Sequence, residues 1–239
     1  LAHQGARVLI IDLDSQANST FAVGLAKFTD EMEDDLKDCN VFHLIKSSKK
    51  YPIKEVARKT TYSKDNIDAI PAHISLMNEE RDLVEVAVCR TRMRYKLEEV
   101  KNDYDYVFID TPPSLNLYAK IALISADYLV IPSDLKPFAN EGLNNVISFI
   151  EEVNDDKEAF RLKPINLLGV LPSKISTNAR FIQYTLPKRR EVIRERYNLP
   201  LFETNIYERD DLAKALDKTI LVGDLEIPDP KSIFEYKLD

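Results

Sequence analysis

The chain has 239 residues, of which 44% are hydrophobic, and 33 basic and 40 acidic side chains give it a net charge of −7. This composition is typical of a globular protein with a sizeable core, and the acidic balance argues against a protein that coats DNA with its whole surface. A local basic patch stays open. No run of about 18 apolar residues occurs, so we expect no transmembrane helix. The two cysteines and three histidines lack metal-ligand spacing, which favours a cytoplasmic protein with reduced thiols and no zinc site.

The first third of the chain predicts short elements around two strands. A final helical turn ended by Gly5 leads directly into a strand over residues 7–12. Pro71 halts a second strand that begins at Asn66. Between the strands we expect a loop entering a short helix (16–26), an acidic loop or helix (28–38), a helical turn (41–45) and a short edge element (53–56).

Later elements alternate regularly between helix and strand. Apolar residues at helical spacing predict one long helix from Ser75 to Val100. Beyond it we expect strands at 106–110, 128–132, 165–171 and 201–206, helices at 115–125, 139–153, 178–197 and 210–216, and an extended tail over 222–239. Because such alternation requires crossover connections, the fold class is α/β, with a doubly wound, mostly parallel sheet and helices on both faces. No linker divides the chain, so residues 1–239 are expected to form a single domain.

Two strands end on acidic residues. The runs Val8–Asp12 and Tyr106–Asp110 are short and rich in apolar residues, which predicts strands buried on both faces of a parallel sheet. In open α/β sheets the carboxyl ends of the strands face the ligand crevice, so Asp12, Asp14 and Asp110 are expected to meet there. Neighbouring carboxylates repel one another unless a cation lies among them, and Mg²⁺ with a polyphosphate would provide it. The sequence therefore predicts a nucleotide-driven switch.

A glycine-rich phosphate loop is missing from the sequence. No G-x-x-x-x-G-K-[ST] pattern occurs, and the five glycines are too scattered to build one. Because a helix cannot sensibly begin at Leu1, we expect a strand, a phosphate loop and most of a helix to precede it. Alternatively, the phosphate site is built in another way.

Several segments together resemble one protein family. The two most specific are the D-L-D-x-Q-x-N run that begins at Asp12 and the D-T-P-P-S-L run that begins at Asp110. Further matching segments lie at residues 70–73, 125–127, 141–143 and 201–204, so the resemblance covers nearly the whole chain. On these motifs the chain resembles the ParA/MinD group of deviant-Walker ATPases, and within it the ParA side.

The resemblance implies an activity and partners. Members of this family form a homodimer around two ATP molecules, bind DNA or another surface without sequence preference, and hydrolyse ATP when an adaptor protein (ParB-like or McdB-like) stimulates them. The cycle positions cargo such as plasmids, chromosomes or large protein assemblies. The implied location is the cytoplasm, in association with the nucleoid, and the implied cofactors are ATP and Mg²⁺.

Residue roles follow from the matching positions. Asp110 corresponds to the Walker B aspartate that holds the water shell of Mg²⁺, and Asp14 to the carboxylate that orients the attacking water. Asp12 is expected next to the metal site as a second supporting carboxylate. Thr111 and Pro112 belong to the loop that senses the γ-phosphate. For Asp14 the alternative is that it only caps the following helix.

Two further segments resemble those of one subgroup of the family. The segment from Pro132 to Gly142 and the tail from Val222 to Pro230 look like cyanobacterial McdA-like proteins, which include carboxysome-positioning ATPases. In that subgroup the phosphate loop lacks the signature lysine, and a lysine from elsewhere reaches the nucleotide. We hypothesise that Lys136 plays this part, since a compact ammonium suits phosphate. The alternative is a solvated surface lysine.

Adenine and DNA contacts are assigned to the second half of the chain. Pro172, Ser173 and Tyr207, on loops after the last strands, are the candidates for adenine recognition. One predicted helix carries five basic residues against two acidic ones, which suits phosphate contacts through counterion release. These DNA-binding candidates are Lys188, Arg189, Arg190, Arg194 and Arg196. The alternative is an ordinary solvated helix face with Glu–Arg pairs.

Three other functions are weighed against a positioning ATPase. A catalytically inactive interaction module with the same fold predicts that the complete protein does not bind ATP. A MinD-like membrane switch requires a basic amphipathic helix at the C-terminus, which the acidic, proline-containing residues 222–239 do not provide. A protein of the nitrogenase-iron-protein kind requires cluster-bridging cysteines, and Cys39 and Cys89 do not fit that role.

Overall fold

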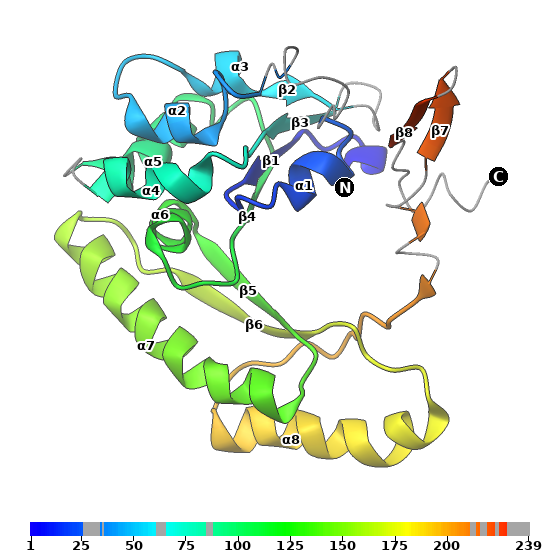
Figure 1. Ribbon diagram of the computed structural model, residues 1–239. Coiled ribbons are helices and arrows are strands. Elements are labelled where there is room, and N and C mark those ends of the chain that lie inside the picture. The colour runs from blue at the N-terminus through cyan, green and yellow to red at the C-terminus, as the bar shows by residue number, and fades with distance from the viewer. Residues whose placement is uncertain are drawn as a thin grey trace. The chain divides into compact units, whose positions relative to one another are not determined.

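The computed structural model describes residues 1–25, 34, 36–60, 66–84, 88–210, 214–215, 219–222 and 225–228. The chain divides into two compact units, residues 1–125 with 213–239, and residues 126–212. Each unit is an α/β arrangement, which confirms the predicted fold class (Figure 1). The expectation of one domain over 1–239 stays a prediction.

The first unit is built on a four-stranded sheet in the order β2-β3-β1-β4. Its strands are β1 (Val8–Asp12), β2 (Arg58–Lys59), β3 (Ile67–Ile70) and β4 (Tyr106–Asp110). β1 pairs in parallel with β3 and with β4, whereas β2 runs antiparallel to β3. The unit also contains an antiparallel pair, β7 (Thr219–Val222) and β8 (Leu225–Pro228).

Short helices surround this sheet. They are the 3₁₀-helix η1 (Ala2–Gln4) and the α-helices α1 (Asn18–Ala22), α2 (Val41–Lys46), α3 (Ile53–Val56), α4 (Leu76–Val84), α5 (Cys89–Glu99) and α6 (Leu117–Ser125). As predicted, Gly5 ends the first helical turn, with a left-handed φ of 91° that glycine adopts without steric cost. Helices α2, α4, α5 and α6 pack against one another as one layer. Figure 1 shows this layer beside the sheet.

Only one of the two acid-tipped strands is buried as predicted. In β1, Leu9 and Ile11 are fully buried, and β3 and β4 pair with its two edges. In β4, by contrast, Tyr106, Val107 and Phe108 are 48%, 39% and 50% exposed. The expectation that β4 is buried on both faces is therefore wrong. β4 lies at the end of the strand order, and its apolar side chains lack the cover that β1 receives.

The second unit contains a two-stranded parallel sheet and two long helical segments. These are β5 (Tyr128–Ser133), α7 (Pro137–Ala159), β6 (Asn166–Pro172), the π-helix η3 (Phe181–Thr185) and α8 (Leu186–Arg196). A shift in strand register occurs between Leu129 and Val130. Next to it Gly169 has a φ of 142°, and an added Cβ would lie 2.8 Å from the carbonyl oxygen of Pro200. Glycine at this position thus permits close backbone packing.

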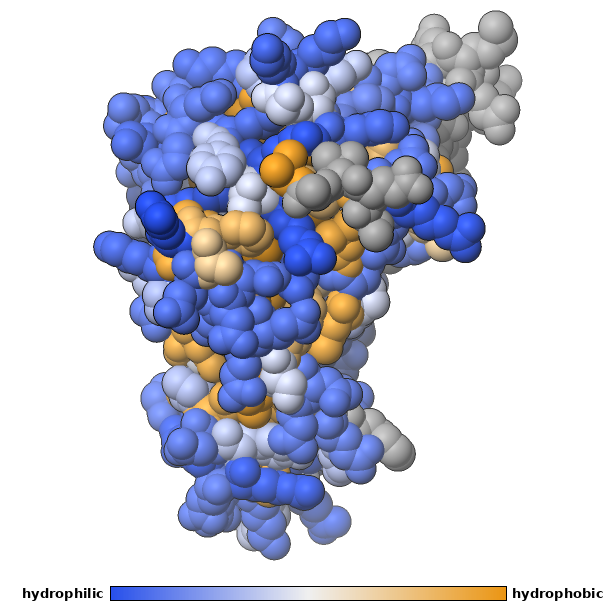
Figure 2. Space-filling view, turned by 90° about the vertical axis from the view of Figure 1, so that its left-hand side faces the viewer, coloured by the Kyte–Doolittle hydropathy of each residue, from blue (hydrophilic) through white to orange (hydrophobic). Residues whose placement is uncertain are grey.

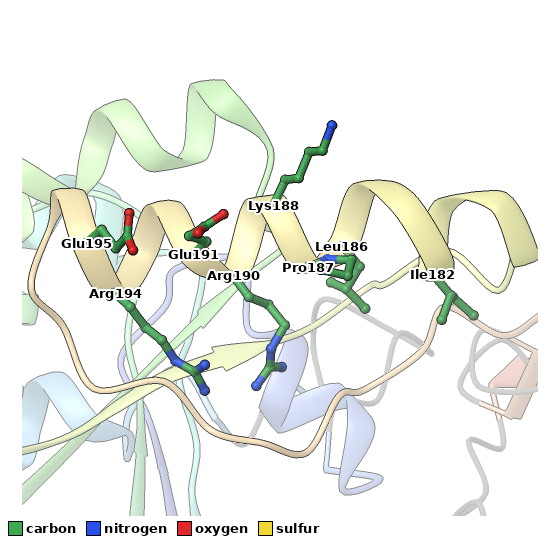
Figure 3. Close-up of a pocket in the computed structure, with 8 residues that line it drawn as sticks. All are labelled: Ile182, Leu186, Pro187, Lys188, Arg190, Glu191, Arg194 and Glu195. Atoms are coloured by element: carbon green, nitrogen blue, oxygen red, sulfur yellow. The ribbon is translucent and has the colours of Figure 1, made fainter.

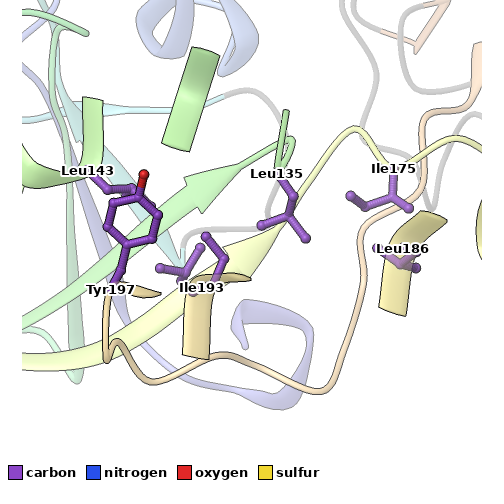
Figure 4. Packing of buried hydrophobic residues seen from close by; sticks show 7 residues of the cluster. Leu135, Leu143, Ile175, Leu186, Ile193 and Tyr197 are labelled. Atoms are coloured by element: carbon purple, nitrogen blue, oxygen red, sulfur yellow. The ribbon is translucent and has the colours of Figure 1, made fainter. Parts of the chain in front are cut away.

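One apolar cluster joins the elements of the second unit. It contains Leu143 of α7, Val170 of β6, Ile193 of α8, and also Leu135, Ile175, Leu186 and Tyr197 (Figure 4). Both helices therefore pack on the same core beside the sheet. Tyr128, Val130 and Leu168 of the two strands are exposed instead.

The structure corrects several predicted elements. The helix expected over 75–100 comprises two helices, α4 and α5, and residues 85–87 between them lie outside the described residues. The edge element at 53–56 is the helix α3. The strand expected at 201–206 is reduced to one isolated bridge, from Leu201 to Val170, and Tyr207, just beyond it, forms a second bridge with Ile175. Residues 26–33 and 35 of the predicted elements 16–26 and 28–38, and much of the helix 210–216 and the tail 222–239, also lie outside the described residues.

Surface composition agrees with the absence of an apolar run in the sequence. Hydrophilic residues dominate the face shown in Figure 2, and apolar residues gather there only in small areas. Within the described part of the chain, no helix has both the length and the apolar character needed to cross a membrane.

Candidate nucleotide site

The acidic ends of β1 and β4 lie side by side. In the parallel register Asp12 is the partner of Asp110, and the backbone N–H of Leu13 donates to the carbonyl oxygen of Asp110 at 2.9 Å. At the other end of this strand pair, Arg7 forms a forked contact with Asp105, with Nη2 to Oδ1 at 2.8 Å and Nε to Oδ2 at 3.2 Å. The carboxyl edge of the sheet thus presents neighbouring carboxylates, as the strand-end motifs predict.

Asp12 is buried and fully engaged by the protein. It is 1% exposed; its Oδ1 accepts from the N–H of Asp14 at 3.0 Å, and its Oδ2 accepts from the N–H and hydroxyl of Thr20, both at 2.8 Å. Burial raises the pKa of Asp12, an effect that these hydrogen bonds oppose. Because both oxygens already accept hydrogen bonds, Asp12 shapes the loop that carries Asp14. Its support of a metal site stays a prediction, and a direct contact with the metal is disfavoured.

Asp14 begins a tight turn after β1. Its Oδ1 accepts from the N–H of Gln16 at 3.0 Å, and the N-cap of α1 is Ala17, which has a left-handed φ of 52°. The alternative that Asp14 caps the following helix is therefore wrong. Beside Asp14 lies a groove of about 520 Å³, and its lining also includes Met77, Glu80, Pro112 and Tyr118. Asp14 and the predicted γ-phosphate-sensing loop thus line one groove.

Asp110 is exposed at the tip of β4. Its Oδ2 accepts from the hydroxyl of Ser19 at 2.6 Å, and Ser19 is its only side-chain partner among the described residues. A carboxylate oxygen at an open strand end fits Mg²⁺, which prefers oxygen ligands and retains several of its waters. In the described part of the chain no three His, Cys, Asp or Glu side chains converge to cage a metal ion.

Sequence reasoning missed Ser19 and Thr20. Both lie in the short helix α1, and Thr20 is 1% exposed. The Thr20 hydroxyl donates to Asp12 and accepts from the N–H of Ala72 at 2.9 Å, so it joins the end of β1 to the segment after β3. The sequence feature that could have indicated them is the presence of two adjacent hydroxyl residues directly after the D-L-D-x-Q-x-N motif.

In the second unit, Lys136 follows β5 and is the N-cap of α7. Its ammonium contacts Oδ2 of Asp134 at 3.0 Å, and its N–H donates to Oδ1 of the same carboxylate at 2.9 Å. Between the two, buried Leu135 has a left-handed φ of 57°, which is strained for a side-chain-bearing residue. Lys136 is thus at a strand's carboxyl end, and its side chain is paired with Asp134.

The candidates for adenine contacts lie together at the end of β6. The N–H of Ser173 donates to the carbonyl oxygen of Ser133 at 2.8 Å, and the N–H of Ile206 donates to that of Pro172 at 2.8 Å. Tyr207 forms a parallel bridge with Ile175 and packs on the apolar cluster. Loops after both strands of this sheet therefore converge, and the adenine contact itself stays a prediction.

The basic residues of α8 fall into two groups. Arg190 and Arg194 both contact Glu203, and Arg190 also donates to Oδ1 of Asn205 at 2.9 Å. In Figure 3, Lys188 points away from these two arginines. A separate hollow of about 290 Å³ has basic lining residues Lys188, Arg189 and Arg196 and one acidic residue, Glu141. Arg190 and Arg194 also line a pocket, of about 570 Å³ (Figure 3), so the two groups differ in the ion pairs that Arg190 and Arg194 make with Glu203 rather than in facing a hollow.

The arrangement of helices and parallel strands places the protein in the α/β, P-loop NTPase-like fold class. A family model described as an AAA domain matches residues 1–162. A ParA family protein of Chlamydia trachomatis is 31% identical over 211 residues, which cover 84% of this chain and 76% of the relative. Soj of Bacillus subtilis, a sporulation initiation inhibitor protein, is 35% identical over 153 residues. The chain belongs to the ParA/MinD family of ATPases.

Solved structures share the fold of this chain. The apo form of McdA from Cyanothece has a TM-score of 0.70 at 22% identity, covering 90% of this chain and 79% of McdA. A plasmid partition protein of Borrelia burgdorferi bound to AMPPNP has a TM-score of 0.66 at 21% identity, covering 99% and 85%. The matching region spans only part of the length of some relatives. It covers 73% of an uncharacterized Methanocaldococcus jannaschii protein and 56% of Soj.

Proposed function

We propose that the protein is a dimerising, Mg²⁺-dependent ATPase that binds DNA without sequence preference and positions or partitions cargo. The observation that carries this proposal is the pairing of Asp12 with Asp110 at adjoining strand ends, followed by Asp14, in a member of the ParA/MinD family. Structures of related fold were determined with an ATP analog and magnesium and, for McdA, with ATP. The name of the plasmid partition protein of Borrelia burgdorferi supports a role in partitioning.

The roles that we propose for the carboxylates at the carboxyl edge of the first unit's sheet follow from their exposure and their contacts. Exposed Asp110 holds the water shell of Mg²⁺, which neutralises charge on the phosphates. Half-buried Asp14 orients the attacking water, and buried Asp12 fixes the loop that carries it. Thr111 and Pro112, which directly follow Asp110, sense the γ-phosphate. Since phosphoryl transfer depends on positioning and electrostatics, these few groups can account for the chemistry.

We propose that the phosphate loop comes from residues outside 1–239. Two observations support this. The sequence contains no glycine-rich loop, and the apolar side chains Tyr106, Val107 and Phe108 of β4 are exposed. An additional strand and helix beside β4 would cover them. The strand and phosphate loop that we expect before Leu1 would supply the missing loop and would also cover these side chains.

Lys136 is proposed as a phosphate contact that must first leave Asp134. The Lys136 side chain is 64% exposed and that of Asp134 26% exposed, so exchanging Asp134 for a phosphate costs little. Lys136→Ala should weaken ATP binding and dimerisation in the complete protein. Wild-type values for both would remove the proposal. Pro172, Ser173 and Tyr207 remain the proposed adenine contacts.

The DNA contact is proposed for the α8 surface. Lys188, Arg189 and Arg196 line a hollow and are suited to phosphates, whereas Arg190 and Arg194 are occupied by Glu203. DNA binding in this proposal depends on the ATP-bound homodimer, and a ParB-like or McdB-like adaptor stimulates hydrolysis. Plasmids, chromosomes or assemblies such as carboxysomes are the proposed cargo classes, and the cytoplasm, at the nucleoid, is the proposed location.

The test is ATP turnover by the complete protein and by Asp14→Asn. We expect wild-type protein to bind and slowly hydrolyse ATP, and Asp14→Asn to keep binding while losing turnover by about 100-fold or more, as for removal of a positioned catalytic group. Equal turnover in both proteins would contradict the role of Asp14. No ATP binding by the wild-type protein would instead favour an inactive interaction module.

A further inference from the structure

Ser19 makes a specific contact with the proposed magnesium-holding carboxylate. Its hydroxyl donates to Oδ2 of Asp110 at 2.6 Å, across 91 positions of sequence. This length is typical of a hydroxyl bound to an ionised carboxylate, an interaction about twice as strong as a neutral hydrogen bond. The contact fastens α1, which follows the Asp14 turn, to the tip of β4.

The neighbouring residue keeps Ser19 in place. Thr20 donates through both its N–H and its hydroxyl to buried Asp12, and its hydroxyl accepts from Ala72. These bonds fix the backbone of α1 independently of Asp110. The hydroxyl of Ser19 is therefore held beside a carboxylate that is otherwise exposed at a strand end.

We infer that Ser19 is a positioning residue that orients Asp110 for the hydrated magnesium ion, an inference that rests on the proposed function. One carboxylate oxygen is engaged by Ser19, so the carboxylate has a preferred rotation, and its Oδ1 would be the oxygen left to hold the metal's water shell. Hydrogen bonds to the carboxylates of metal sites commonly set their orientation, and their loss lowers metal affinity by about 10- to 100-fold.

The experiment measures ATP binding by the complete protein as a function of magnesium concentration. Ser19→Ala should raise the half-saturating magnesium concentration by about tenfold. ATP affinity in the presence of EDTA should stay at the wild-type value, since Ser19 acts only through Asp110. Ser19→Thr keeps a hydroxyl and should restore most of the magnesium response.

A matched control separates this role from the general loss of a hydroxyl. Ser47→Ala removes a hydroxyl that accepts from the N–H of Lys50 at 2.9 Å, away from the acidic strand ends, and should leave the magnesium response unchanged. An unchanged or lowered magnesium requirement in Ser19→Ala, with wild-type ATP binding intact, overturns this inference alone. Equal losses of ATP affinity with magnesium and with EDTA also overturn it, because they indicate a structural role. Failure of the wild-type protein to bind magnesium and ATP overturns the proposed function as well.

Discussion

Two basic helices look alike in sequence and differ in the structure. Residues 90–96 and 188–196 each combine several lysines and arginines with helical spacing. On α5, Lys96 is 5% exposed and donates to the carbonyl oxygens of Leu44, Lys50 and Tyr51 at 2.8 to 2.9 Å. On α8, Lys188 is exposed at a hollow. The groups around a basic side chain, rather than the number of charges nearby in the sequence, therefore decide whether it has a structural role or is available to a ligand.

The largest expected effect on stability concerns Lys96 of α5. Lys96→Met removes the ammonium that satisfies three carbonyl oxygens at and after the end of α2. We expect the free energy of unfolding to fall by about 3 kcal/mol, because buried acceptors lose charged donors. Chemical denaturation measures this change. As a control, Lys101→Met alters a lysine whose side chain is 66% exposed and whose ion pair with Glu98 spans 3.8 Å, and it should cost less than about 0.5 kcal/mol. Similar losses of unfolding free energy in both variants would show that Lys96 has no special structural role.

Within α8 the same distinction separates Arg190 from Arg189. The Arg190 side chain is 13% exposed and binds Glu203, Asn205 and the carbonyl oxygen of Phe202. Arg190→Ala should therefore destabilise the protein by about 1 to 2 kcal/mol. Arg189→Ala, whose guanidinium lies over the ring of Phe181 at 5.0 Å, should cost about 0.5 kcal/mol or less. The reverse order in thermal unfolding would show that the assignment of the two arginines is wrong.

A DNA-binding experiment tests whether the exposed basic residues of α8 contact phosphates. In the complete protein with ATP, the double variant Lys188→Ala, Arg189→Ala should weaken DNA binding at every sequence tested. Because two phosphate contacts are removed, the slope of log affinity against log salt should fall by about 2. Binding isotherms at several salt concentrations measure it. Replacing Arg92, which donates to the carbonyl oxygen of Ile45 at 3.1 Å, should leave that slope unchanged in protein that remains folded. An unchanged slope in the double variant would remove α8 as the DNA surface.

The smallest effect concerns Arg7, a basic residue held by an exposed carboxylate. Hydrogen bonds from Arg7 lower the pKa of Asp105 from 3.8 to about 2. A depressed carboxylate pKa stabilises the folded state above the unfolded pKa, and this contribution is lost as the pH falls through the folded value. We expect a modest loss of stability between about pH 4 and pH 2, which Asp105→Asn should reduce. Identical pH profiles for both proteins would contradict this expectation.

The sequence predicted what depends on local pattern. The strand runs 8–12 and 106–110, the helix ended by Gly5 and the α/β class are confirmed, since apolar periodicity and glycine conformations are local properties. The adjacency of the acidic strand ends is also confirmed, because the carboxyl ends of parallel strands meet at one edge of a sheet.

Side-chain partners depend on contacts far apart in sequence and were not predictable. The bonds from Ser19 to Asp110 and from Arg190 to Glu203 and Asn205 join separate elements. The exposure of β4 likewise depends on which strands neighbour it, and a local apolar run does not contain that information. Lys96 could not be recognised as buried, since a lysine in a polar helix ordinarily faces solvent.

The most direct test of the central claim is the magnesium dependence of ATP binding by the complete protein and by Asp110→Asn. If Asp110 holds the hydrated ion, wild-type protein binds ATP more tightly with magnesium than with EDTA, and Asp110→Asn loses most of this difference while remaining folded. Equal magnesium dependence in the two proteins, or none in the wild-type protein, would contradict the account.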